Sequence, residues 1–87
     1  LKEARDQAFA KLEMVGAVAA DRLQAIELCI KSELTDEWIE RSMALADVMI
    51  EEGQLNEALE ALGLMVGDRP EDPGLLDMLA SLYRRLE

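Results

Sequence analysis

A helical pattern that restarts after about 34 residues is the feature that most constrains this fold. A large, a small and a second large residue occur twice at the same spacing: Leu45, Ala46 and Met49, then Leu79, Ala80 and Tyr83. Gly53 and Pro70 lie between the two sets, where a turn and a helix stop are needed. A repeat of this length is typical of a solenoid of paired helices. We therefore expect a protein that acts by binding.

Small residues between large ones indicate how the two helices of this unit pack. Antiparallel helices approach closely only where a small side chain lies at the crossing, which assigns that position to Ala46 and Ala58. Leu45 and Leu62 would fill the space around the crossing. Gly53 would close the first helix, because glycine adopts a positive φ without a Cβ penalty.

The order and spacing of these residues resemble the tetratricopeptide repeat, over about residues 39–87. The residues that carry the resemblance are Leu45, Ala46, Met49, Gly53, Ala58, Leu62 and Pro70, with the restart at Leu79. The chain departs from the family pattern at Ser42, where an aromatic residue is expected, and at Met65, where a small one is expected. The resemblance implies a right-handed solenoid of antiparallel helix pairs.

We expect one all-α domain over residues 1–87, with about five helices. Half of the residues are apolar but few are aromatic, so the core must consist of aliphatic side chains and methionine, which suits helices. No stretch approaches the about 20 consecutive apolar residues of a membrane span. The chain begins at Leu1 without a methionine or a leader segment, so we expect it to be part of a longer protein.

The better repeat is predicted at about residues 36–69 and the final helix at about residues 72–86. Thr35 is a candidate N-cap of the first of these helices. Asp72, followed by proline, is the predicted N-cap of the last. Gly63 lies inside the second helix of the repeat, where glycine costs up to about 1 kcal/mol relative to alanine. A close approach by a neighbouring helix would explain it.

The first third of the chain has two interpretations. In the preferred one, residues 6–34 form a degenerate repeat with a turn at Ala20 and Asp21, and Asp21 with Gln24 forms a capping box for the second helix. In the alternative, a single long helix runs through residues 2–33, because neither proline nor glycine occupies the proposed turn.

The chain is strongly acidic. It has 19 aspartates and glutamates against 9 lysines and arginines, no histidine, and a formal net charge of −10. Such a surface repels phosphate groups, so we expect neither nucleic acid nor an anionic membrane as a direct partner. Ten of the carboxylates lie in residues 33–68, where Arg41 is the only basic residue. They form either a solvated face or an acidic groove for a basic segment.

The residue types argue against catalysis. Without histidine there is no Ser-His or Cys-His pair and no histidine metal ligand, and a glycine-rich phosphate loop is also lacking. Cys29 lies in an apolar helical run, and we expect it to pack in the core. A single cysteine fits a reducing compartment, which weakly favours the cytoplasm. We expect no enzyme activity, no metal and no cofactor.

The resemblance implies a concave groove lined by the first helix of each pair. Its positions in this chain are Glu40, Met43, Asp47, Ile50 and Glu51 in the better repeat, and Asp77, Ser81, Arg84 and Arg85 in the last. Family members that bind chaperone tails need lysine and asparagine where this chain has Met43 and Asp47, so that ligand is disfavoured. A basic or amphipathic segment of a partner protein fits better. Alternatively, Met43 and Ile50 face the core.

The final helix has more apolar residues than one packing stripe requires. A terminal unit of a solenoid normally has a polar outer face. We therefore expect this helix either to continue into further repeats or to join copies of the chain, as in a homodimer. The alternative is that the helix is itself a cap that packs more deeply than its pattern indicates. The residues predicted to form the self-association face are Leu76, Leu82 and Leu86.

Overall fold

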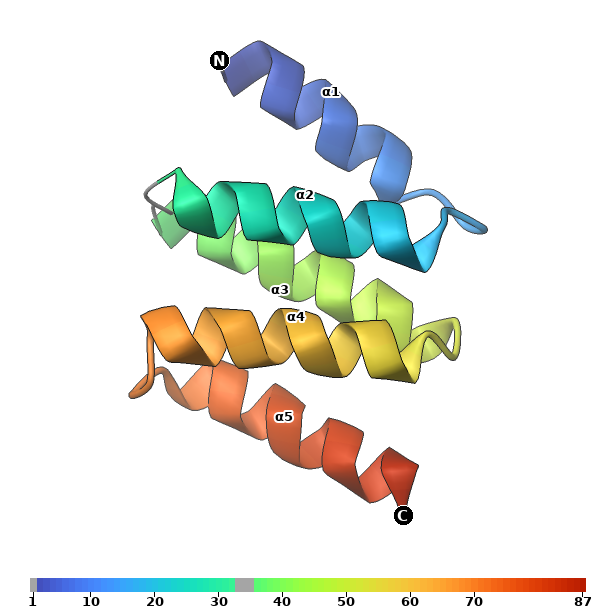
Figure 1. Ribbon diagram of the computed structural model, residues 1–87, viewed down its shortest axis with the longest axis vertical. Helices are drawn as coiled ribbons and strands as arrows, with labels where there is room; N and C mark the ends of the chain where they lie inside the picture. The colour runs from blue at the N-terminus through green and yellow to red at the C-terminus, as the bar shows by residue number, and fades with distance from the viewer. Residues whose placement is uncertain (1, 33–35) are drawn as a thin grey trace.

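A computed structural model describes residues 2–32 and 36–87 of the chain (Figure 1). Over these residues the fold is all-α, with five helices and no strand, which confirms the expected fold class. The helices are α1 (Lys2–Leu12), α2 (Ala19–Lys31), α3 (Asp36–Glu51), α4 (Leu55–Asp68) and α5 (Pro73–Leu86).

The helices stack along one direction in chain order, so that the molecule is a thin slab of 38 × 30 × 15 Å. In Figure 1, α2 and α4 lie side by side in the front layer, with α3 behind them, α1 at one end of the stack and α5 at the other. Helix α4 is the central element, because it packs against α2, α3 and α5.

Small residues at the centre of the stack allow α3 and α4 to pack closely. Ala46 on α3 and Ala58 and Ala61 on α4 are all fully buried, and so are Leu45 and Leu62 beside them. Gly53, in the turn between these helices, has a φ of +78°, as the sequence predicts. The predicted small-residue crossing is therefore part of the core.

Helix α5 begins as its sequence predicts. The Asp72 carboxylate accepts hydrogen bonds from the backbone N–H groups of Gly74 (2.9 Å) and Leu75 (3.2 Å), and Pro73 opens the helix. The interpretation of Gly63 was wrong, however. A Cβ added at Gly63 would meet no atom within 4 Å, so no neighbouring helix approaches there.

The first third of the chain forms two helices, so the single-helix alternative is wrong. The break is earlier than the predicted turn at Ala20 and Asp21: α1 ends at Leu12, and α2 begins at Ala19. Gly16, with a φ of +89°, makes the turn. Asp21 lies in the first turn of α2 and is not its cap, so the predicted capping box is also wrong. The predicted cap Thr35 lies outside the described residues.

A buried arginine joins the α1–α2 turn to the α3–α4 turn. The fully buried Arg22 guanidinium donates five hydrogen bonds, one for each of its N–H groups. The acceptors are the backbone carbonyls of Leu12 (2.8 Å) and Met14 (2.9 Å), both Glu52 carboxylate oxygens (3.1 Å each) and the Gln54 side-chain oxygen (2.7 Å).

Glu52 and Gln54 extend this network to the α1–α2 turn. The Glu52 carboxylate also accepts a hydrogen bond from the Gly16 backbone N–H (3.2 Å), and the Gln54 amide donates to the Ala17 carbonyl (3.0 Å). The hydrogen bonds from Arg22 are the main reason that the pKa of Glu52 lies below its ordinary value of 4.5. The sequence did not indicate this network, because its members are about 30 residues apart along the chain.

Helix α1 is tied to α3 by Arg41 and a pair of aromatic rings. Arg41 forms ion pairs with Asp6 and with Glu13 (3.0 Å). Its guanidinium carbon also lies 5.5 Å from the centre of the Phe9 ring and 5.6 Å from that of Trp38. The two rings pack at 5.3 Å, tilted by 55°. The one base of the acidic region is therefore a structural residue.

Candidate functional site: a groove between α3 and α5

Two hollows lie along α3, on the side that faces α5 and the α4–α5 connection. The first hollow, of about 320 Å³, is lined by Asp36, Ile39, Glu40, Met43, Arg69 and Asp72. The second hollow, of about 290 Å³, is lined by Asp47, Ile50, Glu51, Asp77, Met78, Ser81 and Arg85. We refer to the two together as the α3–α5 groove.

The groove combines an apolar floor with an acidic rim. Ile39 and Ile50 are almost fully buried, with 3% and 5% of their surface exposed, so the hollows reach down to the core. Glu40, Asp47 and Asp77 are exposed and form no ion pair with any described residue. The rim therefore carries carboxylates that its own arginines do not neutralise.

Each hollow contains one arginine that is already paired with a carboxylate. In the first hollow, Arg69 Nη1 lies 2.6 Å from Asp36 Oδ1, and this hydrogen bond is the main reason that the pKa of Arg69 is raised. In the second hollow, Arg85 Nη2 lies 3.5 Å from Glu51 Oε1. Both pairs are solvent-exposed on at least one side, so each contributes little to folding stability.

The structure brings most of the predicted groove residues together. Glu40 and Met43 line the first hollow, and the predicted residues that line the second are Asp47, Ile50, Glu51, Asp77, Ser81 and Arg85. Arg84 lines neither hollow and donates to the Ser81 hydroxyl at 3.2 Å. The alternative placement in the core also holds in part, because Ile50 is buried and Met43 packs against buried residues.

Sequence reasoning missed Asp36, Ile39, Arg69, Asp72 and Met78 as lining residues. Helical spacing in the sequence could have indicated two of them, because Asp36 and Ile39 lie one helical turn before Glu40 and Met43, on the same side of α3. Arg69 and Asp72 come from the connection after α4, whose position depends on how α4 and α5 pack. No local pattern specifies that position.

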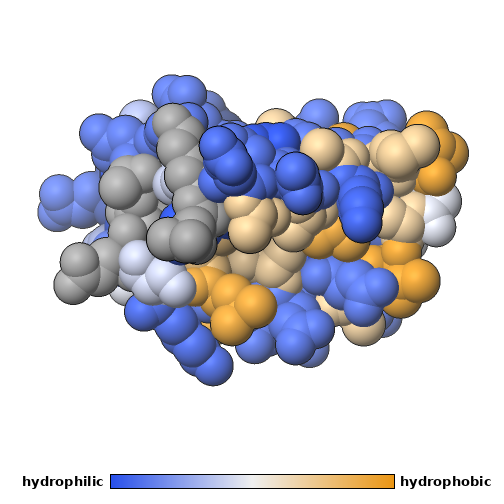
Figure 2. Space-filling model, turned by 90° about the horizontal axis from the view of Figure 1, so that it is seen from above, coloured by the Kyte–Doolittle hydropathy of each residue, from blue (hydrophilic) through white to orange (hydrophobic). Residues whose placement is uncertain are grey.

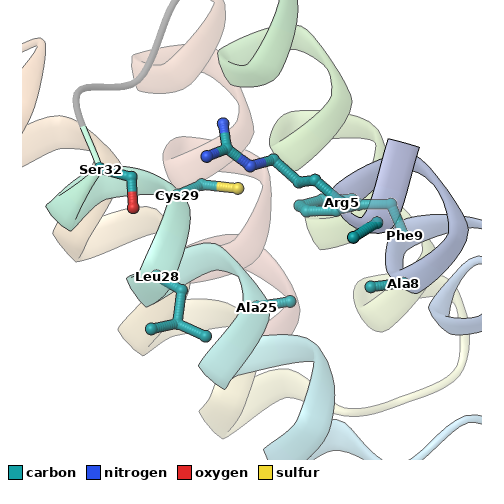
Figure 3. A pocket seen from close by; sticks show the side chains of 8 residues that line it. Arg5, Ala8, Phe9, Ala25, Leu28, Cys29 and Ser32 are labelled. Carbon is teal, nitrogen blue, oxygen red and sulfur yellow. The ribbon is translucent and has the colours of Figure 1, made fainter. Parts of the chain in front are cut away.

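A third hollow, of about 350 Å³, lies between α1 and α2. In Figure 3 the Arg5 side chain extends from α1 toward the Cys29 sulfur on α2. Burial raises the pKa of the Cys29 thiol above its ordinary value of 9.0, and the charge of Arg5 opposes this rise. The thiol is therefore protonated at neutral pH and is a poor nucleophile. Cys29 is 2% exposed, which confirms its predicted place in the core.

The outer side of α5 is apolar, but it is not made of the three predicted leucines. Leu76 and Leu86 are 44% and 40% exposed, as expected, and Tyr83 is exposed between them. Leu82 is fully buried. Its assignment to the self-association face is therefore corrected, because residues 75 and 82 lie on the inner side of α5, two helical turns apart.

Apolar side chains are also exposed at the end of the stack that carries α1. Figure 2 shows them gathered at the edge of that face, on the side away from the residues drawn in grey. In the α1–α2 connection the exposed apolar residues are Met14, Val15 and Val18. Both ends of the stack thus carry uncovered apolar surface.

Two further searches concern the described residues alone. No helix among them is both long and apolar enough to cross a bilayer. Nowhere do three or more of their cysteine, aspartate and glutamate side chains converge in an arrangement that could hold a metal ion.

Comparison with known protein families, with curated proteins and with solved structures finds no match to this chain.

Proposed function

We propose that this chain is a non-catalytic protein-interaction module of the tetratricopeptide type, and that the α3–α5 groove binds a basic, amphipathic segment of a partner protein. One observation carries the proposal: the groove has an apolar floor beneath exposed, unneutralised carboxylates. An amphipathic helix satisfies both features, because its apolar side chains cover the floor while its basic side chains meet the rim.

The charge of the chain supports this choice of partner. A net charge of −10 attracts a basic segment over a long range and speeds its association, and salt screens this attraction. The partly buried Met43 and Met78 in the hollows provide apolar contact that tolerates different side chains. The proposal therefore specifies a chemical class of partner, a basic helix, and a salt-sensitive affinity.

Charge reversal in the groove tests the proposal. The probe is a labelled amphipathic helical peptide of about 20 residues, with leucine on one face and arginine or lysine on the other, and affinity is measured by fluorescence anisotropy. The variant Glu40→Lys, Asp47→Lys, Glu51→Lys should bind at least about tenfold more weakly and should lose most of the salt dependence. Unchanged affinity would show that the groove is not the binding site.

A matched control separates the groove from net charge. The variant Glu3→Lys, Asp21→Lys, Glu60→Lys reverses three exposed carboxylates on α1, α2 and α4, outside the groove. It changes the net charge by the same amount and should retain most of the affinity. A peptide with glutamate in place of its basic residues should bind neither the wild-type protein nor this control variant.

Self-association through α5 is a second candidate function, favoured by the exposed Leu76, Tyr83 and Leu86. These three residues follow one side of the helix, and a continuous apolar strip is typical of an interface. Light scattering behind size exclusion, over a dilution series, should show a concentration-dependent dimer.

The test of this interface must avoid the buried Leu82. Leu76→Glu with Leu86→Glu should give a monomer with unchanged helicity, whereas Leu64→Glu, at an exposed position of α4, should leave the dimer intact. A wild-type chain that is monomeric at all concentrations would exclude this candidate and leave the groove proposal unaffected.

A further inference from the structure

Helix α3 carries the same short pattern, Asp-x-x-Ile-Glu, twice. The first copy is Asp36, Ile39 and Glu40, and the second is Asp47, Ile50 and Glu51. The copies begin 11 residues apart, which in an α-helix is just over three whole turns. Both copies therefore face the same direction, about 16 Å apart along the axis of α3.

Each copy of the pattern lines its own hollow. The first copy contributes all three of its residues to the first hollow, and the second copy contributes all three to the second hollow. In both, the isoleucine forms the buried floor and the two carboxylates lie at the exposed rim. The groove thus consists of two hollows that share this pattern and lie at a fixed separation along α3.

Each hollow also already contains a guanidinium group of this chain. Arg69 pairs with the aspartate of the first copy, Asp36, and Arg85 pairs with the glutamate of the second, Glu51. These contacts show which side chain the carboxylates accept. The remaining rim carboxylates, including Glu40 and Asp47, are not neutralised by these arginines. Each hollow can therefore bind a second cation.

We infer that the preferred ligand is an α-helix with two arginines 11 residues apart on one face, each of which enters one hollow. This inference rests on the proposed function and specifies its partner. A ligand helix lying along α3 has the same rise per residue as α3 itself, so a pair of side chains spaced by 11 residues matches the two hollows. Arginine fits better than lysine, because its planar fork can bond two carboxylate oxygens at once.

The spacing of the arginines provides the decisive test. Three labelled alanine-rich helical peptides have the same composition and two arginines placed 11, 9 or 7 residues apart. Arginines 11 apart share a face and reach about 16 Å, those 7 apart share a face but reach only about 10 Å, and those 9 apart lie on opposite faces. The first peptide should bind about tenfold more tightly than either of the others.

Variants of each hollow complete the test. Asp36→Asn with Glu40→Gln removes the charges of the first copy, and Asp47→Asn with Glu51→Gln removes those of the second. Either pair should reduce the affinity for the 11-spaced peptide to about that of the 7-spaced peptide, because only one hollow keeps both carboxylates of its copy of the pattern. The control Asp21→Asn with Glu60→Gln, outside the groove, should retain the preference for the 11-residue spacing.

The outcomes separate this inference from the proposed function. Equal binding of the three peptides, together with a loss of affinity on charge reversal in the groove, would overturn the two-hollow inference and keep the groove. A loss that follows only one of the two copies would also overturn it. If no peptide distinguishes wild-type protein from the charge-reversed variant, the proposed function itself fails. Circular dichroism of every variant confirms that the helices are intact.

Discussion

The two ends of the helical stack differ in how much charged side chains add to apolar packing. Helices α3, α4 and α5 pack through apolar side chains, among them fully buried alanines. Helices α1 and α2 also contribute Phe9, Ile26 and Cys29 to the buried core, but charged side chains add to this packing: Arg22 links two turns, and Arg41 links α1 to α3. Apolar packing tolerates small shifts, whereas a five-donor guanidinium network requires one geometry.

This difference shows how a small domain with few aromatic residues can fix its first helix. Among the α1 side chains whose burial is described, at residues 3–12, only Phe9 is buried, so α1 has little apolar area with which to hold its place. Directed ion pairs and ring contacts supply the missing specificity. Arg22 and Arg41 both stabilise the fold, so their charges do not neutralise the carboxylates of the α3–α5 groove.

Loss of Arg22 should be the most damaging change. Arg22→Met keeps the aliphatic stem but leaves the Glu52 carboxylate and two backbone carbonyls without their donor. We expect the free energy of unfolding to fall by about 3 kcal/mol, measured by urea denaturation. As a control, Arg85→Met breaks an exposed pair and should cost well under about 1 kcal/mol. A small loss of stability in Arg22→Met would show that apolar packing is the main force at this end.

Loss of Arg41 should release α1 alone. Arg41→Met removes two ion pairs and two ring contacts, and we expect a loss of about 1 kcal/mol. Hydrogen exchange should accelerate in α1 and stay slow in α4. Arg84→Met, whose only described contact is with Ser81, should change neither. Uniform acceleration over all helices would contradict the division between the two ends.

Gly63→Ala should increase the stability of the end formed by α3, α4 and α5. The added methyl group meets no atom, and alanine is the better helix former, so we expect a gain of about 0.5 to 1 kcal/mol in thermal or urea denaturation. Gly53→Ala is the contrasting variant. Its φ of +78° disfavours any side chain, so it should lower stability even though space is available there.

The Glu52 carboxylate should make the stability of the α1–α2 end depend on pH. Because its pKa is lowered in the folded state, mainly by Arg22, its contribution is complete well above pH 4.5. As the pH falls through 4.5, the unfolded state gains the proton first, and stability decreases until the folded carboxyl is also protonated. Glu52→Gln should flatten this part of the curve of stability against pH. An unchanged slope would assign the acid sensitivity to other carboxylates.

The sequence predicted the end of the molecule formed by α3, α4 and α5 well. Gly53 and the Asp72–Pro73 pair are local signals that need no knowledge of the tertiary fold, and the structure confirms both. Most of the groove was also predictable, because residues of α3 at helical spacing share a face whatever lies opposite. The part that was missed, Arg69 and Asp72, comes from a connection whose place depends on packing.

The end of the molecule formed by α1 and α2 was predicted poorly for a related reason. Gly16 marks the α1–α2 turn, but the turn was predicted four residues later, at Ala20 and Asp21. The burial of Arg22 depends on Glu52, which lies 30 residues away in sequence, and no local pattern links the two. Leu82 was misassigned for a simpler reason: both sides of α5 are apolar, so its pattern does not show which side faces inward.

The two copies of Asp-x-x-Ile-Glu lie on one uninterrupted helix, so the geometry of α3 fixes the distance between them. Backbone hydrogen bonds set the distance between the copies, so substitutions elsewhere in the core do not alter it. A single residue inserted between Ile39 and Asp47, however, would rotate one copy by about 100° relative to the other. Such a chain could keep its charge and helicity and still lose the alignment of its two hollows. Changes in the length of α3 would therefore affect recognition far more severely than most changes in its side chains.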